Sequence, residues 1–287
     1  MARGRGMGRP NERPRGELVG LGDNIMATGM ARAKVKGTAK RAAFGDGKKI
    51  IWDHNSAQIF KYNPSIAPPK CEKDRDLEWI HFYRGNRVYN HHDTENNRWV
   101  WNYGFKAIPG EIFLDTMEKR FAISHVPVDD YVVIEPNVQT GKLGTINKDW
   151  GLKNYQKLAD DLRRKGVPIV QPIYDGARQL VGVPKVKTQN FRYALAVMER
   201  AKAYVGPEGG LHHAAAAFGK PGVVIFGGFI PPSVTGYAIH RNLTGLTDSF
   251  CGSLAPCDHC RTALDSITVD QVRGEIWTVI SGASSVA

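Results

Sequence analysis

The chain has 287 residues, of which 42% are hydrophobic and 23% are charged, and its net charge is +11. This length accommodates two ordinary domains or one large domain, and no run approaches the roughly 20 apolar residues that a membrane span needs. Four cysteines in a chain of this size do not suggest a disulfide framework, so we expect a reducing, cytoplasmic setting.

The positive charge is concentrated at the start of the chain. Residues 1–49 contain 12 Lys or Arg and 4 Asp or Glu. The first segment, MARGRGMGRPNERPRGE, has no apolar stretch after its charges, so it is not a secretory signal. Such charge favours a polyanionic binding partner. The partner is either nucleic acid or an anionic lipid surface, and in the second case the protein would be peripherally bound to that surface. For residues 1–15 a solvated, flexible tail is the alternative.

The next segment is predicted to be a strand that runs into a glycine turn and a helix. Residues 17–25 have the pattern of a short strand, and a helix follows over about 25–36. Asp23 stands at the junction, where its carboxylate either caps the helix or acts as a general base. A further strand is predicted over residues 49–52, followed by a proline-containing loop over 64–69.

Residues 70–120 are less regular and combine aromatic side chains with arginines. Such a mixture can stack sugars or bases and hold phosphates, and an ordinary aromatic core is the alternative. The candidate acceptor contacts here are Arg84, Arg87, Trp99 and Trp101.

From residue 131 the pattern becomes α/β. Apolar strands are predicted over 131–134, 167–170, 203–205 and 223–226, with helices over about 150–164, 191–200 and 211–218. This alternation predicts a doubly wound parallel sheet, whose ligands bind beyond the carboxyl ends of its strands.

The turn between the third of these strands and its helix has the composition of an anion site. Gly209 and Gly210 let a ligand approach the backbone, and the first turn of the helix offers free N–H groups and a positive dipole end. His212 and His213 stand in that turn. A structural turn without a ligand is the alternative interpretation.

Several residue groups, taken together, go beyond this general pattern. They are Gly22-Asp23, Lys148-Asp149-Trp150 with its helix, the run from Val205 to His213, Gly219-Lys220-Pro221, and the segment from Cys260 to Val272. This set resembles glycosyltransferase family 9, the heptosyltransferase-like enzymes, over roughly 16–36 and 131–275.

The resemblance implies a GT-B fold, in which two Rossmann-like, doubly wound α/β domains face each other across a cleft. Residues 1–15 would then be the basic tail, 16–128 a reduced acceptor-binding domain, and 129–287 the domain that holds the nucleotide sugar. The apolar spacing over 269–280 predicts a last helix, which in such folds commonly crosses back to the first domain.

The resemblance also implies a reaction and its residues. Family members invert the anomeric centre and need no metal, so the expectation is a nucleotide-diphosphate sugar as donor and no cofactor. Asp23 matches the general base, and Lys148 matches the lysine that meets the donor's phosphates. Glu208, Gly209 and Gly210 stand where the family has D-[ST]-G, and His213 matches the histidine that follows. His212 is an addition to the family pattern.

The acceptor is expected to be polyanionic, and two alternatives remain for it. One is a saccharide on an anionic bacterial glycan, and the other is a hydroxylated base of DNA or RNA. A non-catalytic nucleic-acid-binding protein on a GT-B-like fold is the alternative from a different functional class.

The cysteines of the C-terminal part have a spacing compatible with a metal site. Cys251, Cys257 and Cys260 would hold zinc if Cys71 came near as a fourth ligand. A reduced cluster without metal is the favoured interpretation.

Overall fold

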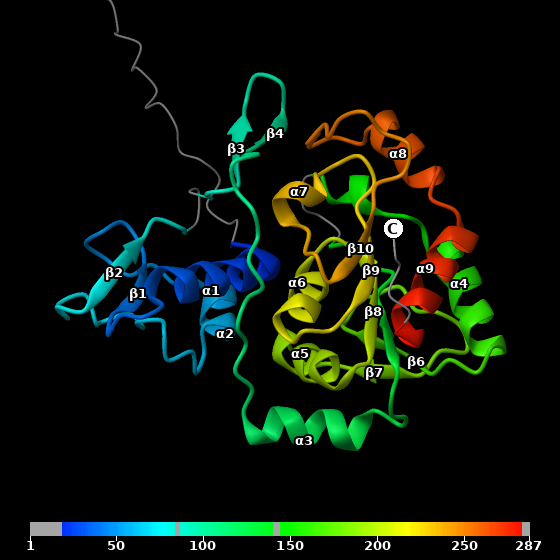
Figure 1. The fold of residues 1–287 in the computed structure, drawn as a ribbon, viewed down its shortest axis with the longest axis horizontal. Coiled ribbons are helices and arrows are strands. Elements are labelled where there is room, and N and C mark those ends of the chain that lie inside the picture. The colour runs from blue at the N-terminus through cyan, green and yellow to red at the C-terminus, as the bar shows by residue number, and fades with distance from the viewer. Residues whose placement is uncertain (1–18, 84–86, 140–143, 283–287) are drawn as a thin grey trace, which may run out of the picture.

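The computed structural model describes residues 19–83, 87–139 and 144–282. These residues form a larger part built on a six-stranded sheet and a smaller N-terminal part beside it (Figure 1). Arg84, one of the candidate acceptor contacts, lies outside the described residues. None of the described helices combines the length and apolar character that a membrane span requires.

The N-terminal part contains two helices and a short parallel strand pair. These elements are α1 (Leu21–Val35), β1 (Arg41–Phe44), α2 (His54–Ile59) and β2 (Leu77–Ile80). β1 pairs with β2 in parallel, with Arg41 opposite Leu77. Among the residues described, the sheet of this smaller part therefore contains only these two paired strands, fewer than a doubly wound sheet would have.

Two strand predictions in this part are wrong. Helix α1 begins at Leu21, within the predicted strand over 17–25, because the Asp23 carboxylate accepts the Gly20 N–H and starts the helix early. Of the strand predicted over 49–52, only Ile50 makes an isolated bridge, to Gly45. The parallel ladder is formed instead by β1, which we had not predicted.

A hairpin and a long connection join the two parts. The hairpin consists of β3 (Asn90–Asp93) and β4 (Arg98–Trp101), which are antiparallel. The chain then runs between the two parts to α3 (Thr116–His125), as Figure 1 shows. On the way the Glu111 N–H donates to the Thr28 hydroxyl of α1 at 2.7 Å.

The larger part is built on a parallel sheet with the order β10-β9-β8-β5-β6-β7. Its strands are β5 (Val132–Ile134), β6 (Ile169–Ile173), β7 (Lys185–Lys187), β8 (Ala203–Pro207), β9 (Gly222–Ile225) and β10 (His240–Leu243). The predicted strands correspond to β5, β6, β8 and β9, with β6 displaced by two residues.

Helices cover both faces of this sheet. The helices are α4 (Leu152–Arg164), α5 (Phe191–Arg200), α6 (Gly210–Ala217) and α9 (Val269–Ser281). α5 and α6 lie toward the N-terminal part, while α4 and α9 pack together on the opposite face (Figure 1). α9, which we expected to be able to cross back to the first domain, packs against α4, β8 and β9. Shorter helices are η1 (Thr145–Lys148), α7 (Pro232–Thr235) and α8 (Asp258–Asp265).

One hydrophobic core is shared by the two parts. It joins Ile25 of α1, Phe44 of β1 and Tyr89 to Leu195 of α5 and Ala215 of α6. A second core, on the other face of the sheet, lies under α4 and α9. Because the first core is continuous, the N-terminal part is held against one face of the sheet by buried apolar surface.

A buried ion pair reinforces this junction. The Arg192 guanidinium of α5 makes a bidentate contact with the Glu118 carboxylate of α3, and these side chains are 5% and 8% exposed. The same guanidinium donates to the Gln58 carbonyl of α2 and to the Phe113 carbonyl, both at 2.6 Å. One side chain thus ties the end of α2 and the inter-domain connection to the helix layer of the sheet.

Arg192→Met is predicted to lower the free energy of unfolding by about 3–5 kcal/mol, because the buried Glu118 carboxylate loses its bidentate partner and retains only the Asp115 N–H and the partly exposed Lys61 ammonium at 3.8 Å. Lys187→Met is the matched control, since Lys187 pairs with Asp175 at 3.0 Å but the two side chains are 70% and 91% exposed. Its cost should be at most about 1 kcal/mol. Urea denaturation measures both, and equal destabilisation by the two variants would contradict the assigned role of Arg192.

Candidate functional site

The N-terminal ends of α1 and α6 meet between the two parts. A Cβ placed on Gly22 would lie 2.6 Å from Cδ2 of His213 and 3.4 Å from the carbonyl carbon of Gly209. Position 22 therefore has no room for a side chain without displacement of the histidine ring. The contact brings together the positive ends of two helix dipoles, which favours an anion at this point.

The start of α6 is open on the side of Gly209. This residue precedes the helix, its backbone is extended, and it makes no side-chain cap hydrogen bond. A Cβ built on Gly209 would meet nothing within 4 Å, whereas one on Gly210 would lie 3.0 Å from the Phe191 ring. A ligand can therefore reach the backbone at Gly209 without displacing a side chain.

Asp23 lies in the first turn of α1 and receives three contacts. Its Oδ2 accepts the Gly20 N–H at 2.9 Å and lies 3.6 Å from Nε of Arg87. Its Oδ1 accepts a hydrogen bond from the Tyr89 hydroxyl. The capping role is thus present, yet the side chain remains 14% exposed.

Tyr89 is a site residue that we had not singled out. Burial, and then the Asp23 charge, raise the pKa of Tyr89 well above its usual range, so its hydroxyl keeps the proton that it donates to Asp23. Arg87 and Tyr89 both contact the Asp23 carboxylate and fix its orientation at the start of α1.

A chain of four side chains begins at Lys148, at the end of η1. Lys148 forms an ion pair with Glu208, whose Oε1 lies 3.2 Å from Nε2 of His213. The Nδ1 atom of His213 in turn lies 2.8 Å from the Tyr237 hydroxyl. Burial by itself raises the pKa of Glu208, but Lys148 and His213 outweigh it and hold that pKa well below its usual range. Glu208 is therefore a buried carboxylate whose charge is balanced mainly by Lys148.

The position of Lys148 is fixed by its two chain neighbours. The Asn147 amide donates to the carbonyls of Ser253 at 2.9 Å and Ala255 at 2.8 Å. Asp149 accepts two hydrogen bonds from Arg178, at 2.8 and 3.1 Å. The sequence offered no signal for Asn147 or Arg178, because their partners lie far away along the chain.

His212 lies in the buried layer behind His213, and one of its ring nitrogens is within 4.8 Å of a Glu208 carboxylate oxygen and a His213 nitrogen. It is 0% exposed and packs among the rings of Phe226, Tyr237 and His240. Burial lowers its pKa well below the usual range, and neither of its ring nitrogens has a hydrogen-bond partner among the described residues. The prediction that His212 contacts donor phosphate is therefore corrected, since the structure places it in the core.

The aromatic and arginine candidates separate into two groups. The Arg87 guanidinium lies over the partly exposed Trp99 ring, 5.2 Å from its centroid, and also faces Asp23. Trp101 is only 7% exposed and donates its Nε1–H to the Phe229 carbonyl at 3.2 Å. We therefore correct the prediction for Trp101, which supports the hairpin, while Arg87 and Trp99 remain beside the candidate base.

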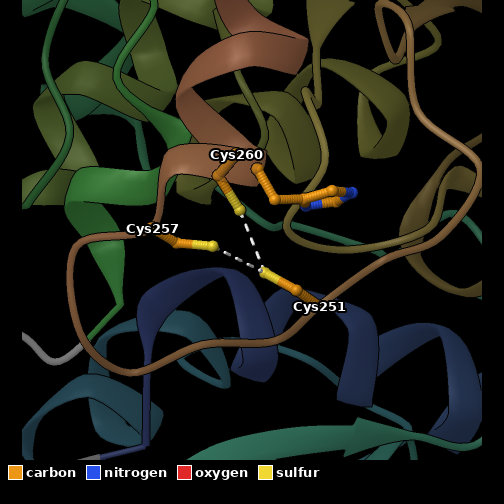
Figure 2. Close-up of side chains that lie close together, drawn as sticks. Cys251, Cys257 and Cys260 are labelled. Atoms are coloured by element: carbon orange, nitrogen blue, oxygen red, sulfur yellow. Dashed lines mark hydrogen bonds between the residues drawn. The ribbon is translucent and has the colours of Figure 1, made fainter.

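Three of the four cysteines gather at the start of α8. Figure 2 shows the sulfur atoms of Cys251, Cys257 and Cys260 directed toward one another. Cys71 lies elsewhere and packs against Ile50 in the N-terminal part. The fourth member of the cluster is His259, not the Cys71 that we had considered.

A protein-family model described as glycosyltransferase family 9 (heptosyltransferase) matches residues 43–258. This range is most of the chain and contains Lys148 and the turn at Glu208, whereas Asp23 precedes it. The search of curated proteins gave no match.

Solved structures resemble the chain at low sequence identity. The glycosyl transferase family 9 protein from Veillonella parvula DSM 2008 has a TM-score of 0.58 and 15% identity, covering 93% of this chain and 96% of that one. The iron-containing dodecameric glycosyltransferase TibC from enterotoxigenic E. coli H10407 has a TM-score of 0.59 and 15% identity, covering 93% and 75%. These two likenesses confirm the predicted GT-B fold.

A third structure, E. coli ADP-heptose lps heptosyltransferase II, has a TM-score of 0.45 and 16% identity. The alignment covers 64% of this chain and 54% of that one, so this chain spans about half of that enzyme's length.

Glu135, a buried carboxyl that directly follows β5, makes the stability of the fold depend on pH. Burial raises the pKa of Glu135 to about 7, although its Oε1 accepts two hydrogen bonds from Asn137. The folded protein thus binds this proton more tightly than the unfolded chain, whose carboxyl has a pKa of 4.5. Ionisation of Glu135 therefore destabilises the fold progressively as the pH rises from 4.5 to about 7, by up to about 3 kcal/mol.

Glu135→Gln, which keeps an acceptor for Asn137, is predicted to be more stable than the wild type at about pH 8. The difference should largely vanish at about pH 5, where the wild-type carboxyl is mostly protonated in the folded state. Urea denaturation at the two pH values measures this, and a difference that does not change with pH would contradict the raised pKa.

Proposed function

The chain belongs to glycosyltransferase family 9, and from this membership we propose that it transfers a sugar from a nucleotide-diphosphate sugar to the hydroxyl of a polyanionic acceptor. The transfer inverts the anomeric centre and uses no metal ion in the reaction. The observation that carries the proposal is the meeting of the α1 and α6 N-termini, which sets Asp23 beside the open start of α6.

The donor's diphosphate would bind at the start of α6. The backbone of Gly209 and Gly210 is accessible there, and Lys148 supplies the cation. Glu208 takes the place of the family's aspartate, and in the ligand-free protein it pairs with that cation. We propose that Lys148 also contacts a donor phosphate when the donor is bound. Glu208, which His213 contacts in turn, would keep its ion pair with Lys148 and so keep the lysine in position.

Asp23 would act on the acceptor. As the acceptor oxygen forms its bond to the anomeric carbon, the hydroxyl proton passes to Asp23, and the bond from that carbon to the phosphate oxygen breaks. The leaving electron pair stays on the nucleoside diphosphate, whose growing charge is stabilised by Lys148 and by the α6 N–H groups. Arg87 and Tyr89 hold the Asp23 carboxylate oriented for this step.

The acceptor would approach from the N-terminal part. Arg87 and the partly exposed Trp99 ring form a cation-aromatic pair next to Asp23. A cavity of about 230 Å³, lined in part by Asn24, Trp52 and Tyr83, lies in the same part of the protein. The Nε1–H of Trp52 is buried and has no partner among the described residues, so it offers a donor to a bound acceptor group.

Both acceptor classes, an anionic bacterial glycan and a hydroxylated nucleic-acid base, suit a basic protein. The salt dependence of acceptor binding distinguishes them, because binding to duplex DNA weakens steeply with added salt as counterions are released.

We further propose that residues 16–128 form the acceptor domain and residues 129–287 the donor domain. The protein would work in the cytoplasm, where nucleotide sugars are available.

The donor is predicted to raise the melting temperature of the protein. A ligand that binds only the folded state adds about 2.7 kcal/mol at a hundredfold excess over its dissociation constant. Among ADP, UDP, GDP and CMP and their common sugars, one nucleotide family should give a shift, and EDTA should not abolish it. The absence of a shift with all of them would count against the transferase.

Lys148→Met is predicted to weaken donor binding about 10- to 100-fold, because one charge-assisted phosphate contact is lost. Lys153→Met, at an exposed position of α4, removes the same charge and should leave the affinity unchanged. Calorimetric titration with the donor nucleotide measures the affinity of the two variants. An equal loss of affinity in Lys148→Met and Lys153→Met would exclude a specific contact between Lys148 and the phosphate.

Asp23→Asn keeps one oxygen that can accept the Gly20 N–H, and its amide NH2 can donate to the Tyr89 hydroxyl, but it removes the base. Transfer is expected to fall by about 10²–10⁴-fold while donor affinity stays within a few-fold. Asp175→Asn, a 91% exposed position, is the control. Full activity in Asp23→Asn would show that another residue acts as the base.

A further inference from the structure

Three cysteines and one histidine form a compact cluster that the proposed transfer reaction does not use. Cys251 lies in the segment between β10 and α8, Cys257 immediately precedes α8, and His259 and Cys260 are in its first turn. One ligand atom from each of the four residues lies within 4.8 Å of the other three. The cluster therefore brings four nitrogen and sulfur donors around one point.

The sulfur separations fit a shared ion better than a bond between two sulfurs. Sγ of Cys251 is 3.1 Å from Sγ of Cys260 and 3.7 Å from Sγ of Cys257. A disulfide requires about 2.05 Å. Thiolates at about 2.3 Å from one tetrahedral ion lie about 3.8 Å apart. The Cys251–Cys257 separation matches this value, and Cys260 would move outward by less than about 1 Å to reach it (Figure 2).

His259 has the arrangement of an imidazole ligand with one nitrogen still available. Its Nε2 lies 2.9 Å from the Thr247 hydroxyl, whereas its Nδ1 is buried and has no hydrogen-bond partner among the described residues. Metal-bound histidines use one nitrogen for the ion and the other for a hydrogen bond. An ion at Nδ1 would remove the cost of a buried, unpaired nitrogen.

The segment that contains Cys251 connects two parts of the candidate site. Gly252 accepts the Trp99 N–H of the hairpin at 2.8 Å, and Ser253 accepts the Asn147 amide beside Lys148. Residues 244–257 nevertheless form no helix and no strand beyond one bridge at Ser253. An ion that joins Cys251 to α8 would hold this segment in place.

We propose that Cys251, Cys257, His259 and Cys260 bind one tetrahedral, thiolate-preferring metal ion, zinc or iron(II). The three thiols lose their protons to solvent on binding, and the imidazole binds as the neutral form. Because protein side chains fill all four positions, the ion is structural and takes no part in sugar transfer. The proposal does not depend on the proposed function, and neither nucleotide binding nor activity enters its test.

The first measurement is the metal content of the full chain, purified under reducing conditions without added metal. Elemental analysis and native mass spectrometry should find one zinc or iron ion per chain in the wild type. Cys71→Ser, the matched control outside the cluster, should retain it, whereas Cys257→Ser and His259→Gln should lose most of it. An iron(II) centre would develop visible thiolate charge-transfer absorption when air oxidises it to iron(III), and a zinc centre would not.

A second measurement on the wild type covers the case in which a cluster variant does not fold. Removal of the metal with a strong chelator should lower the melting temperature by several degrees, and added zinc should restore it. Cobalt(II) in the emptied site should give the visible absorption of a tetrahedral thiolate complex. Metal well below one ion per chain in the wild type, or a melting temperature that the chelator leaves unchanged, would overturn the proposal. A Cys251–Cys260 disulfide in peptide mapping of the unreduced protein would do so as well.

Discussion

The candidate site depends on the contact between Gly22 and His213, where the first turns of α1 and α6 touch. A side chain at position 22 would displace the His213 ring and press against the Gly209 backbone, which would change the position of Asp23 relative to the start of α6. The shared hydrophobic core holds α1 against α6. The Arg192 guanidinium adds an ion pair between α3 and α5, and α5 packs against α6. Packing between the two parts therefore sets the geometry of the site.

Charge balance at this junction explains how acidic residues can occupy an anion site. Two helix N-termini, Lys148 and Arg87 bring positive potential together, and Asp23 and Glu208 offset it when no ligand is bound. Glu208 is buried, and its two carboxylate oxygens contact Lys148 and His213. In the ligand-free protein Lys148 is thus paired with Glu208 at the start of α6.

The sequence predicted those features that rest on local patterns. The apolar runs of β5, β8 and β9, and the helices α4, α5, α6 and α9, were recognised from their periodicity and their glycine or proline ends. The edge strands β7 and β10 were missed because they are short and carry polar residues, and the start of α1 was missed because a side-chain cap decides it. Asp23, Lys148 and Glu208 were assigned their roles from the family resemblance, but the placement of Tyr89 and Arg178 arises from contacts between distant segments. No local pattern reveals such contacts.

The segment over 251–257 contacts the hairpin through Gly252 and the Lys148 turn through Ser253 and Ala255. The hairpin and the Lys148 turn, which are the proposed acceptor and donor sides, are thus joined by one stretch of backbone. If an acceptor that displaces the hairpin alters donor affinity by some factor, thermodynamic linkage requires the donor to alter acceptor affinity by that same factor. The order in which the two substrates bind would then affect the rate of each step, but not the free energy of the ternary complex.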